Sequence, residues 1–311
     1  MAAFEYPAQK VSWNKRDVIL FAHSIGCNSK EQLHFLYEHH PKFQVFPTYP
    51  IVLTFKHDDH DVVDFLARNA AAPIPPGCPH LDWSRAVDGR RRIMLERELP
   101  PISEGRSWEI RSKVLGVYDK GAGKPTIMER EHVLIDRDTK EIYSRAWETA
   151  IFLGTGGWGG NRGPQIVRYS PPENQSPDAV VEHQTTPETA HLYRLNGDYN
   201  PLHASPEAGI ALGYGGIIMH GLYSWNVAAR VILDRYGANK GSNLRDFEAR
   251  FTAPVKPGDK LKVKMWQMGL ITHNTGQKLL EVRFVVEVAD KVVLSDGRAL
   301  LTPPSRIESR L

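Results

Sequence analysis

One long helix with an apolar face, followed by four strand-like runs, constrains the fold of this 311-residue chain more than any other feature. The helical segment extends to Tyr236, and its apolar side chains, among them Leu222 and Trp225, recur at helical spacing. In residues 278–288 apolar and charged side chains alternate, as in a strand with one buried face. A long helix before consecutive strands predicts an α+β arrangement, an antiparallel sheet packed around that helix. The predicted strands are residues 244–255, 260–268, 278–288 and 291–301.

The N-terminal half repeats this order of elements, so the sequence indicates one module used twice. We expect helices near residues 14–25 and 50–69 and a Gly/Pro-rich linker between the copies. This pattern predicts a double hot-dog fold, in which each repeat has a long central helix wrapped by an antiparallel sheet. The strands of the first copy are expected near residues 92–99, 107–118, 127–135 and 141–152. The predicted divisions are an N-terminal repeat at 1–154, a linker at 155–179 and a C-terminal repeat at 180–311.

A short loop of the C-terminal copy brings together three side chains that can move or hold protons. Asp198, Asn200 and His203 place a carboxylate, an amide and an imidazole within six residues. Gly197 and Pro201 should end the preceding helix, which leaves these side chains at a helix end beside a loop. Asp and His can divide proton removal and donation when their surroundings tune their pKa values. The same residue types also build ordinary turns, so the spacing alone allows a structural role.

Gly221 lies in the first turn of the long helix. The first backbone N–H groups of a helix have no partner within it, and the helix dipole places partial positive charge there. Gly221 therefore offers an unobstructed donor to an oxygen that gains negative charge, such as a thioester carbonyl becoming an enolate. A glycine that only permits close packing is the alternative.

Several motifs resemble those of the MaoC-like (R)-specific enoyl-CoA hydratases, also called hydratase 2. They are the segment 193–203, Gly215-Gly216 with Gly221-Leu222, and, in the N-terminal half, the segments 118–123 and 152–160, which are similar to stretches of eukaryotic two-repeat members. The likeness covers nearly the whole chain. It implies reversible addition of water to trans-2-enoyl-CoA, giving (3R)-3-hydroxyacyl-CoA, in fatty acyl-CoA metabolism, with an acyl-CoA thioester as substrate and no cofactor.

The resemblance also implies roles for single residues. Asp198 and His203 would handle the water and its protons, Asn200 would help to hold that water, and Gly221 would supply the oxyanion-hole N–H. Asp88 stands where the family pattern has a histidine, which leaves the chain-length preference open. The residues that the pattern places at the acyl-CoA are Gly89, Lys120, Tyr199 and Phe251.

The first copy lacks the acid–base pair. Aligning its turn with that of the second copy puts Cys27 opposite Asp198 and Gln32 opposite His203. A repeat that keeps the fold without the chemistry is expected to widen the acyl-binding pocket. The alternatives to a hydratase are a dehydratase for a specialised or polyketide-like thioester, a non-catalytic acyl-CoA-binding protein, and a thioesterase. The intact polar set of the second copy favours an enzyme.

Charge and motif spacing argue against other classes of ligand. Lys and Arg number 39 against 36 Asp and Glu, and the only notable basic run is the triplet 90–92, so we expect no nucleic-acid binding. The glycines of 154–159 fit a dinucleotide fingerprint, but no helix is expected after them. The histidines at 39–40 and 57–60 lack the ligand spacing of a metal site, and we expect no metal.

The sequence also predicts where the protein acts. Two cysteines, Cys27 and Cys78, indicate a reducing compartment without a disulfide framework. Nowhere are there eighteen consecutive apolar residues, so we expect no membrane span. The terminal Ser309-Arg310-Leu311 is a close variant of the Ser-Lys-Leu peroxisomal signal, which predicts a peroxisomal location and the import receptor as a partner. A homodimer is possible.

Overall fold

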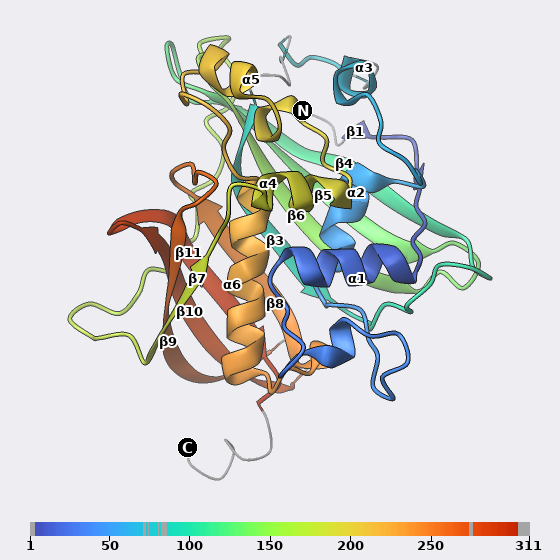
Figure 1. Cartoon of the computed structure of the whole chain (residues 1–311). Helices are drawn as coiled ribbons and strands as arrows, with labels where there is room; N and C mark the ends of the chain where they lie inside the picture. Colours follow the sequence, from blue (N-terminus) through green and yellow to red (C-terminus); the bar gives the residue numbers. More distant parts are fainter. Residues whose placement is uncertain are drawn as a thin grey trace.

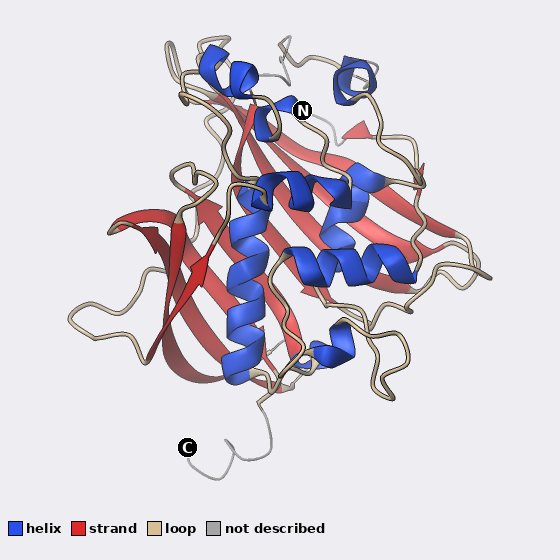
Figure 2. Cartoon of the chain, in the orientation of Figure 1, coloured by secondary structure: helices blue, strands red, loops and turns tan. Residues whose placement is uncertain are grey.

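The computed structural model describes residues 4–70, 73, 75–79, 81, 86–273 and 276–303. The described strands form one sheet of eleven, in the order β1-β4-β5-β6-β3-β8-β11-β10-β9-β7, with β2 paired to β4. Figures 1 and 2 show the helices gathered on one face of this sheet. The strands are β1 Phe4–Glu5, β2 Gln9–Lys10, β3 Ala86–Leu95, β4 Trp108–Asp119, β5 Thr126–Asp136, β6 Ile142–Phe152, β7 Ala179–Gln184, β8 Leu244–Phe251, β9 Lys260–Thr272, β10 Lys278–Val288 and β11 Lys291–Leu301.

The second repeat matches the sequence-based prediction closely. Its central helix is α6, Gly221–Tyr236, and the four predicted strands correspond to β8 to β11. Trp225 of α6 is fully buried, and its ring packs edge-on against Phe247 of β8 at 4.6 Å between centroids. The apolar stripe read from the sequence therefore faces the sheet. Strand β7, which extends this sheet beside β9, was not predicted.

The first repeat differs from the prediction because it has no long central helix. Residues 50–69 instead contain the 3-10 turn η2 Tyr49–Val52, the short helix α2 Leu53–Lys56 and, after a loop, α3 Phe65–Ala70. The helix stops because His57 adopts a positive φ of 56°, and because the buried Lys56 ammonium donates to the carbonyls of Ser12 and Asp59, which holds the turn in place. The predicted first helix is confirmed as α1 Lys15–Ser24. The remaining helices are α4 Thr189–Tyr193 and α5 Pro206–Ala211.

The two halves meet where β3 pairs with β8. Ion pairs cross this seam, from Arg90 to Glu248 and from Arg92 to Asp246, the latter with Nε 3.0 Å from Oδ1. Side chains alternate between the faces of a strand, so the middle residue of this arginine triplet, Arg91, points to the opposite face. Two arginines of the triplet, Arg90 and Arg92, are thus paired with carboxylates of the second repeat.

The glycine-rich segment after β6 binds a carboxylate of its own chain. Asp119 accepts hydrogen bonds from the N–H groups of Gly121 and Gly157 through Oδ1 and of Gly159 and Gly160 through Oδ2, at 2.7 to 3.3 Å. These N–H groups, that of Gly157 foremost, lower the pKa of Asp119 to about 2. No helix follows the glycines before β7. The glycines that match the dinucleotide fingerprint therefore form a loop around Asp119, and no helix follows them, as the sequence predicted.

Candidate active site

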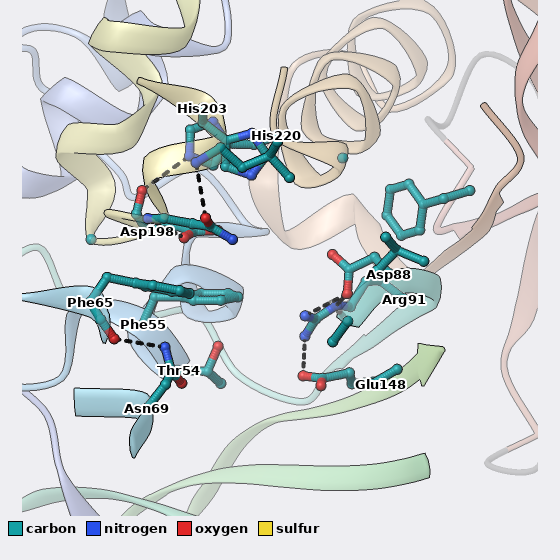
Figure 3. A pocket seen from close by; sticks show the side chains of 18 of the residues that line it. Thr54, Phe55, Phe65, Asn69, Asp88, Arg91, Glu148, Asp198, His203 and His220 are labelled. Carbon is teal, nitrogen blue, oxygen red and sulfur yellow. Dashed lines mark hydrogen bonds and ion pairs between the residues drawn. The ribbon is translucent and has the colours of Figure 1, made fainter. Parts of the chain in front are cut away.

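A cavity of about 660 Å³ lies between the two halves, beside the N-terminus of α6. Its walls include Thr54 and Phe55 of α2, where the first repeat lacks a long helix, and Asp198, His203 and Gly221 of the second repeat. Figure 3 shows two groups of polar side chains across this space, Asp198 with His203 and His220 on one side and Asp88 with Arg91 and Glu148 on the other. The site therefore draws on both repeats.

His203 is held as a neutral base. It ends the 3-10 turn η5 Pro201–His203, and its Nδ1 lies 2.9 Å from the carbonyl oxygen of Ile218. Because a carbonyl can only accept, Nδ1 carries the proton and donates, which leaves Nε2 with a lone pair. Burial lowers the pKa of His203 below its usual value, although the Asp198 carboxylate acts in the opposite direction. At neutral pH this imidazole is ready to accept a proton.

His220 supports this arrangement, and the sequence analysis did not single it out. It precedes the first residue of α6, its ring stacks on that of His203 at 3.8 Å between centroids, and its Nε2–H donates to the carbonyl of Asp198 at 3.0 Å. Burial, and then the neighbouring His203, hold the pKa of His220 well below its usual value. Its position directly before Gly221 was the available signal.

The turn that presents Asp198 requires glycine at position 197. Gly197 has a φ of +115°, and a Cβ there would lie 2.6 Å from the Cα of Lys56. After this turn, Asp198 Oδ1 accepts from the N–H of Asn200 at 3.2 Å, and Asn200 Oδ1 accepts from the N–H of Leu202 at 3.0 Å. The amide oxygen of Asn200 is therefore engaged, and its NH₂ group is the part available to a ligand.

Gly221 is the first residue of α6 and lines the cavity. Among the hydrogen bonds of the described residues, none uses its N–H. Phe251 lies against it, because a Cβ on Gly221 would approach the Phe251 ring to 2.9 Å. The structure thus brings Asp198, Asn200, His203, Gly221 and Phe251 to one cavity, and their roles stay predictions.

Three other residues predicted to touch the ligand lie outside the cavity lining. A side chain on Gly89 would meet that of Ile151 at 2.7 Å. The ammonium of Lys120 donates to the carbonyl of Arg162, and the Tyr199 ring lies 5.3 Å from the Arg194 guanidinium. Their contact with an acyl-CoA stays a prediction.

A group of charged side chains from the first repeat lines the cavity instead, and the sequence analysis had singled out only Asp88 among them for the ligand site. Arg91 donates from Nε to Asp88 Oδ1 at 2.9 Å and from Nη1 to Glu148 Oε2 at 2.5 Å, while Arg130 donates to Glu148 Oε1. His132 Nε2 lies 3.4 Å from Glu148 Oε2. Burial raises the pKa of Asp88, whereas Arg130 and Arg91 hold that of Glu148 well below its usual range despite burial. Sequence spacing gives no signal for this cluster, because its members come from three strands.

The first-repeat counterparts of the acid–base pair do not line the cavity. Cys27 is buried, and burial raises the pKa of its thiol to about 12. Gln32 is fully buried, and its Nε2 donates to Asn239 Oδ1 at 2.8 Å. Both residues are therefore buried, and Gln32 binds the segment that follows α6 in the second repeat.

The histidines first considered as metal candidates do not form a metal site in the described part of the chain. There, Asp198, His203 and His220 are the one group of three or more such side chains with donor atoms close enough together, within 4.8 Å, to hold an ion. One nitrogen of each of these imidazoles already donates to a backbone carbonyl. In the described residues no helix has the length and apolar character needed to cross a bilayer.

Models of two protein families match the chain. Residues 11–153 match the MFE-2 hydratase 2 N-terminal domain, and residues 169–290 match the MaoC like domain. Among curated relatives, the probable dehydratase NIT22 of Ajellomyces capsulatus is 63% identical over 96% of this chain and 81% of its own length. The probable enoyl-CoA hydratase 2 of Dictyostelium discoideum is 30% identical over 93% of this chain and 91% of its own length. The peroxisomal multifunctional enzyme type 2 of Mus musculus is 28% identical over 98% of this chain but only 38% of its own length.

Solved structures agree. The crystal structure of a MaoC-like dehydratase from Phytophthora capsici superposes with a TM-score of 0.85 at 29% identity and covers 98% of this chain and 97% of that one. A Mycobacterium tuberculosis protein with a double hotdog fold superposes with a TM-score of 0.58 at 14% identity. This match covers 96% of this chain and 95% of that one. Fold and site together therefore define a double hot-dog hydro-lyase. The chain belongs to the MaoC-like hydratase and dehydratase family, in which its N-terminal half corresponds to the hydratase 2 N-terminal domain.

Proposed function

We propose that this protein adds water to trans-2-enoyl-CoA to give (3R)-3-hydroxyacyl-CoA, and catalyses the reverse dehydration. One observation carries the proposal: the Asp198 carboxylate and the neutral imidazole of His203 lie in one cavity, beside the N-terminus of α6. Gly221, whose backbone N–H begins that helix, lines the same cavity. A carboxylate and a neutral imidazole that meet at one point can hold a water molecule and exchange its protons with a bound substrate.

The proposed reaction needs three roles, and residues are present for each. The thioester oxygen accepts a hydrogen bond from the Gly221 N–H as C2 gains electrons, which stabilises the enolate. Asp198 and His203 hold the water, one taking its proton as oxygen bonds to C3 and the pair returning a proton to C2. Asn200 donates its NH₂ to the same water. Which of the two takes the proton first is a property of the coupled pair.

The protonation state of His203 gives this mechanism a pH signature. Because burial holds the pKa of His203 below the usual imidazole value, the base stays neutral down to pH values below about 6.5. The acid limb of the kcat/KM profile should therefore lie below 6.5 and move when His203 is replaced.

A second candidate is dehydration of a specialised 3-hydroxyacyl thioester in a biosynthetic pathway. The charged wall of Asp88, Arg91 and Glu148 favours it, because a plain fatty chain gains nothing from such side chains. The relative with 63% identity bears the name of a dehydratase. Both candidates use the same residues and differ in substrate and direction.

A peroxisomal location, import by the peroxisomal receptor and a role in β-oxidation are part of the proposal. They are supported by the terminal Ser309-Arg310-Leu311, which lies outside the described residues, and by relatives named peroxisomal multifunctional enzymes. The divisions at 154 and 180 and a possible homodimer likewise stay predictions.

One experiment separates the proposed activity from the alternatives. The protein is incubated with crotonyl-CoA and trans-2-decenoyl-CoA while loss of the enoyl absorbance and release of free thiol are followed together. A hydratase consumes the enoyl group without releasing thiol. Thiol release would indicate a thioesterase, and no change with either substrate would contradict the hydratase proposal.

A further inference from the structure

The charged cluster of Asp88, Arg91 and Glu148 is built into the wall of the cavity rather than into the seam between the repeats. The ion pairs of Arg90 and Arg92 cross that seam to β8, and neither arginine lines the cavity. Arg91, between them, points to the other face of β3 and reaches the cavity with Asp88 and Glu148. Figure 3 places this trio across the space from Asp198 and His203.

A hydrocarbon chain is a poor occupant for this wall. The side chains of Arg91 and Glu148 are each 5% exposed, so ligand atoms that cover them remove their remaining access to water. Covering charged groups with apolar atoms loses hydration and supplies no hydrogen bond in return. A substituent that hydrogen-bonds compensates for that loss.

The balance of charge indicates what kind of substituent fits. The carboxylates of Asp88 and Glu148 face the guanidinium groups of Arg91 and of Arg130, which lies beside the cluster. Asp198 lies near enough for its charge to act on both Asp88 and Arg91. The charged groups of Asp88, Glu148, Arg91 and Arg130 are already paired with one another, so an added carboxylate or ammonium would find no unpaired countercharge among them. A hydroxyl can donate to a carboxylate or accept from Arg91, and a carbonyl can accept from Arg91, in each case without adding charge.

We propose that the acyl chain of the natural substrate carries a hydroxyl or carbonyl group that hydrogen-bonds to the cluster of Asp88, Arg91 and Glu148 while its thioester lies at Gly221. A carbonyl would accept from Arg91, and a hydroxyl could also donate to the carboxylate of Asp88 or Glu148. This inference rests on the proposed hydratase function and specifies its substrate. The apolar part of the chain would then contact the ring of Phe55, on the wall formed by α2. Asp88, which replaces the histidine of the family pattern, would be a specificity residue.

The test is a matched series of substrates with the wild-type protein. Crotonyl-CoA, trans-2-decenoyl-CoA and trans-2-decenoyl-CoA bearing a single hydroxyl or oxo group at C5, C7 or C9 are compared by kcat/KM. We expect one position to give at least about a tenfold higher kcat/KM than the unsubstituted decenoyl chain, because sites built for a polar group discriminate against analogues that lack it. A ω-carboxylate should be disfavoured. Equal or lower values at every polar position would overturn the proposal, whereas failure to hydrate crotonyl-CoA would overturn the hydratase function itself.

Variants then assign the preference to the cluster. Asp88→Leu should reduce the ratio of polar to alkyl kcat/KM to about one, whereas Asp88→Asn, which can still hydrogen-bond, should keep part of it. The matched control is Glu131→Gln, because Glu131 is a buried carboxylate of β5 that pairs with Lys113 at 2.8 Å and does not line the cavity. This control should leave the ratio unchanged. If folded Asp88→Leu keeps the wild-type ratio of polar to alkyl kcat/KM, the cluster does not set the preference. If this variant does not fold, the substrate series with the wild-type protein still tests the proposal.

Discussion

The N–H of Gly221 can be removed without removing the helix that it begins. Gly221 is the first residue of α6, where proline is well tolerated because that N–H has no partner within the helix. His220 before it has φ −55° and ψ 133°, which is the conformation that a residue preceding proline prefers. Gly221→Pro should therefore fold, and Gly221→Ala provides the matched control.

The structure sets the size of the effect. Both variants add a Cβ that would lie 2.9 Å from the Phe251 ring, so both displace this partly exposed side chain by a similar amount. Only proline also removes the N–H donor. Loss of one oxyanion donor typically lowers kcat by about 10² to 10³-fold, or roughly 3 to 4 kcal/mol. We expect Gly221→Pro to be slower than Gly221→Ala by this factor.

The assay is kcat for hydration of crotonyl-CoA, with circular dichroism and the melting temperature as checks on folding. The comparison between the two variants cancels the steric change that they share. If folded Gly221→Pro and Gly221→Ala turn over at the same rate, the Gly221 N–H does not stabilise the transition state, and the oxyanion assignment is refuted.

Three further predictions concern the rest of the chain. Cys27→Ala and Gln32→Ala should leave kcat within a few-fold of the parent, and a collapse of activity without loss of fold would show that the first repeat takes part in the chemistry. Burial, and then Arg230, lower the pKa of His183 to about 4, so the unfolded chain binds more protons than the folded one as pH falls from about 6.5 towards 4. In urea unfolding, this residue should lower the free energy of unfolding by up to ~1.4 kcal/mol per pH unit over that range, and the fall should be smaller in His183→Gln. A fluorescent protein that ends in the last seven residues of this chain should enter peroxisomes and return to the cytosol without Leu311, whereas a diffuse intact fusion would reject the peroxisomal location.

The sequence was a good guide where one local signal decides the structure. The apolar spacing of α6 and the alternation in β10 predicted both elements. The structure differs from the prediction in burying α6 on nearly all sides and β10 on both faces. The loop around Asp198 was also predictable, since Gly197 and Pro201 leave few backbone conformations. These features depend on residues close together in the chain.

The sequence was a poor guide where distant contacts decide. The expected helix at 50–69 breaks where buried Lys56 donates to the carbonyl of Ser12, 44 residues away, as well as to that of nearby Asp59, and no periodicity reveals the distant contact. His220 belongs to the site only because α6 begins beside the Asp198 loop. The trio of Asp88, Arg91 and Glu148 forms only when β3 and β6 pair. Each is a tertiary contact between segments far apart in sequence.

The most direct test of the central claim is turnover of crotonyl-CoA by Asp198→Asn, His203→Ala and the double variant. His191→Ala serves as control, because His191 is an exposed histidine of α4 that does not line the cavity. We predict that each single change lowers kcat by ~10²-fold or more. The double variant should be little slower than the worse single one, since both groups act on the same water. Near-normal hydration by either folded single variant would contradict the account.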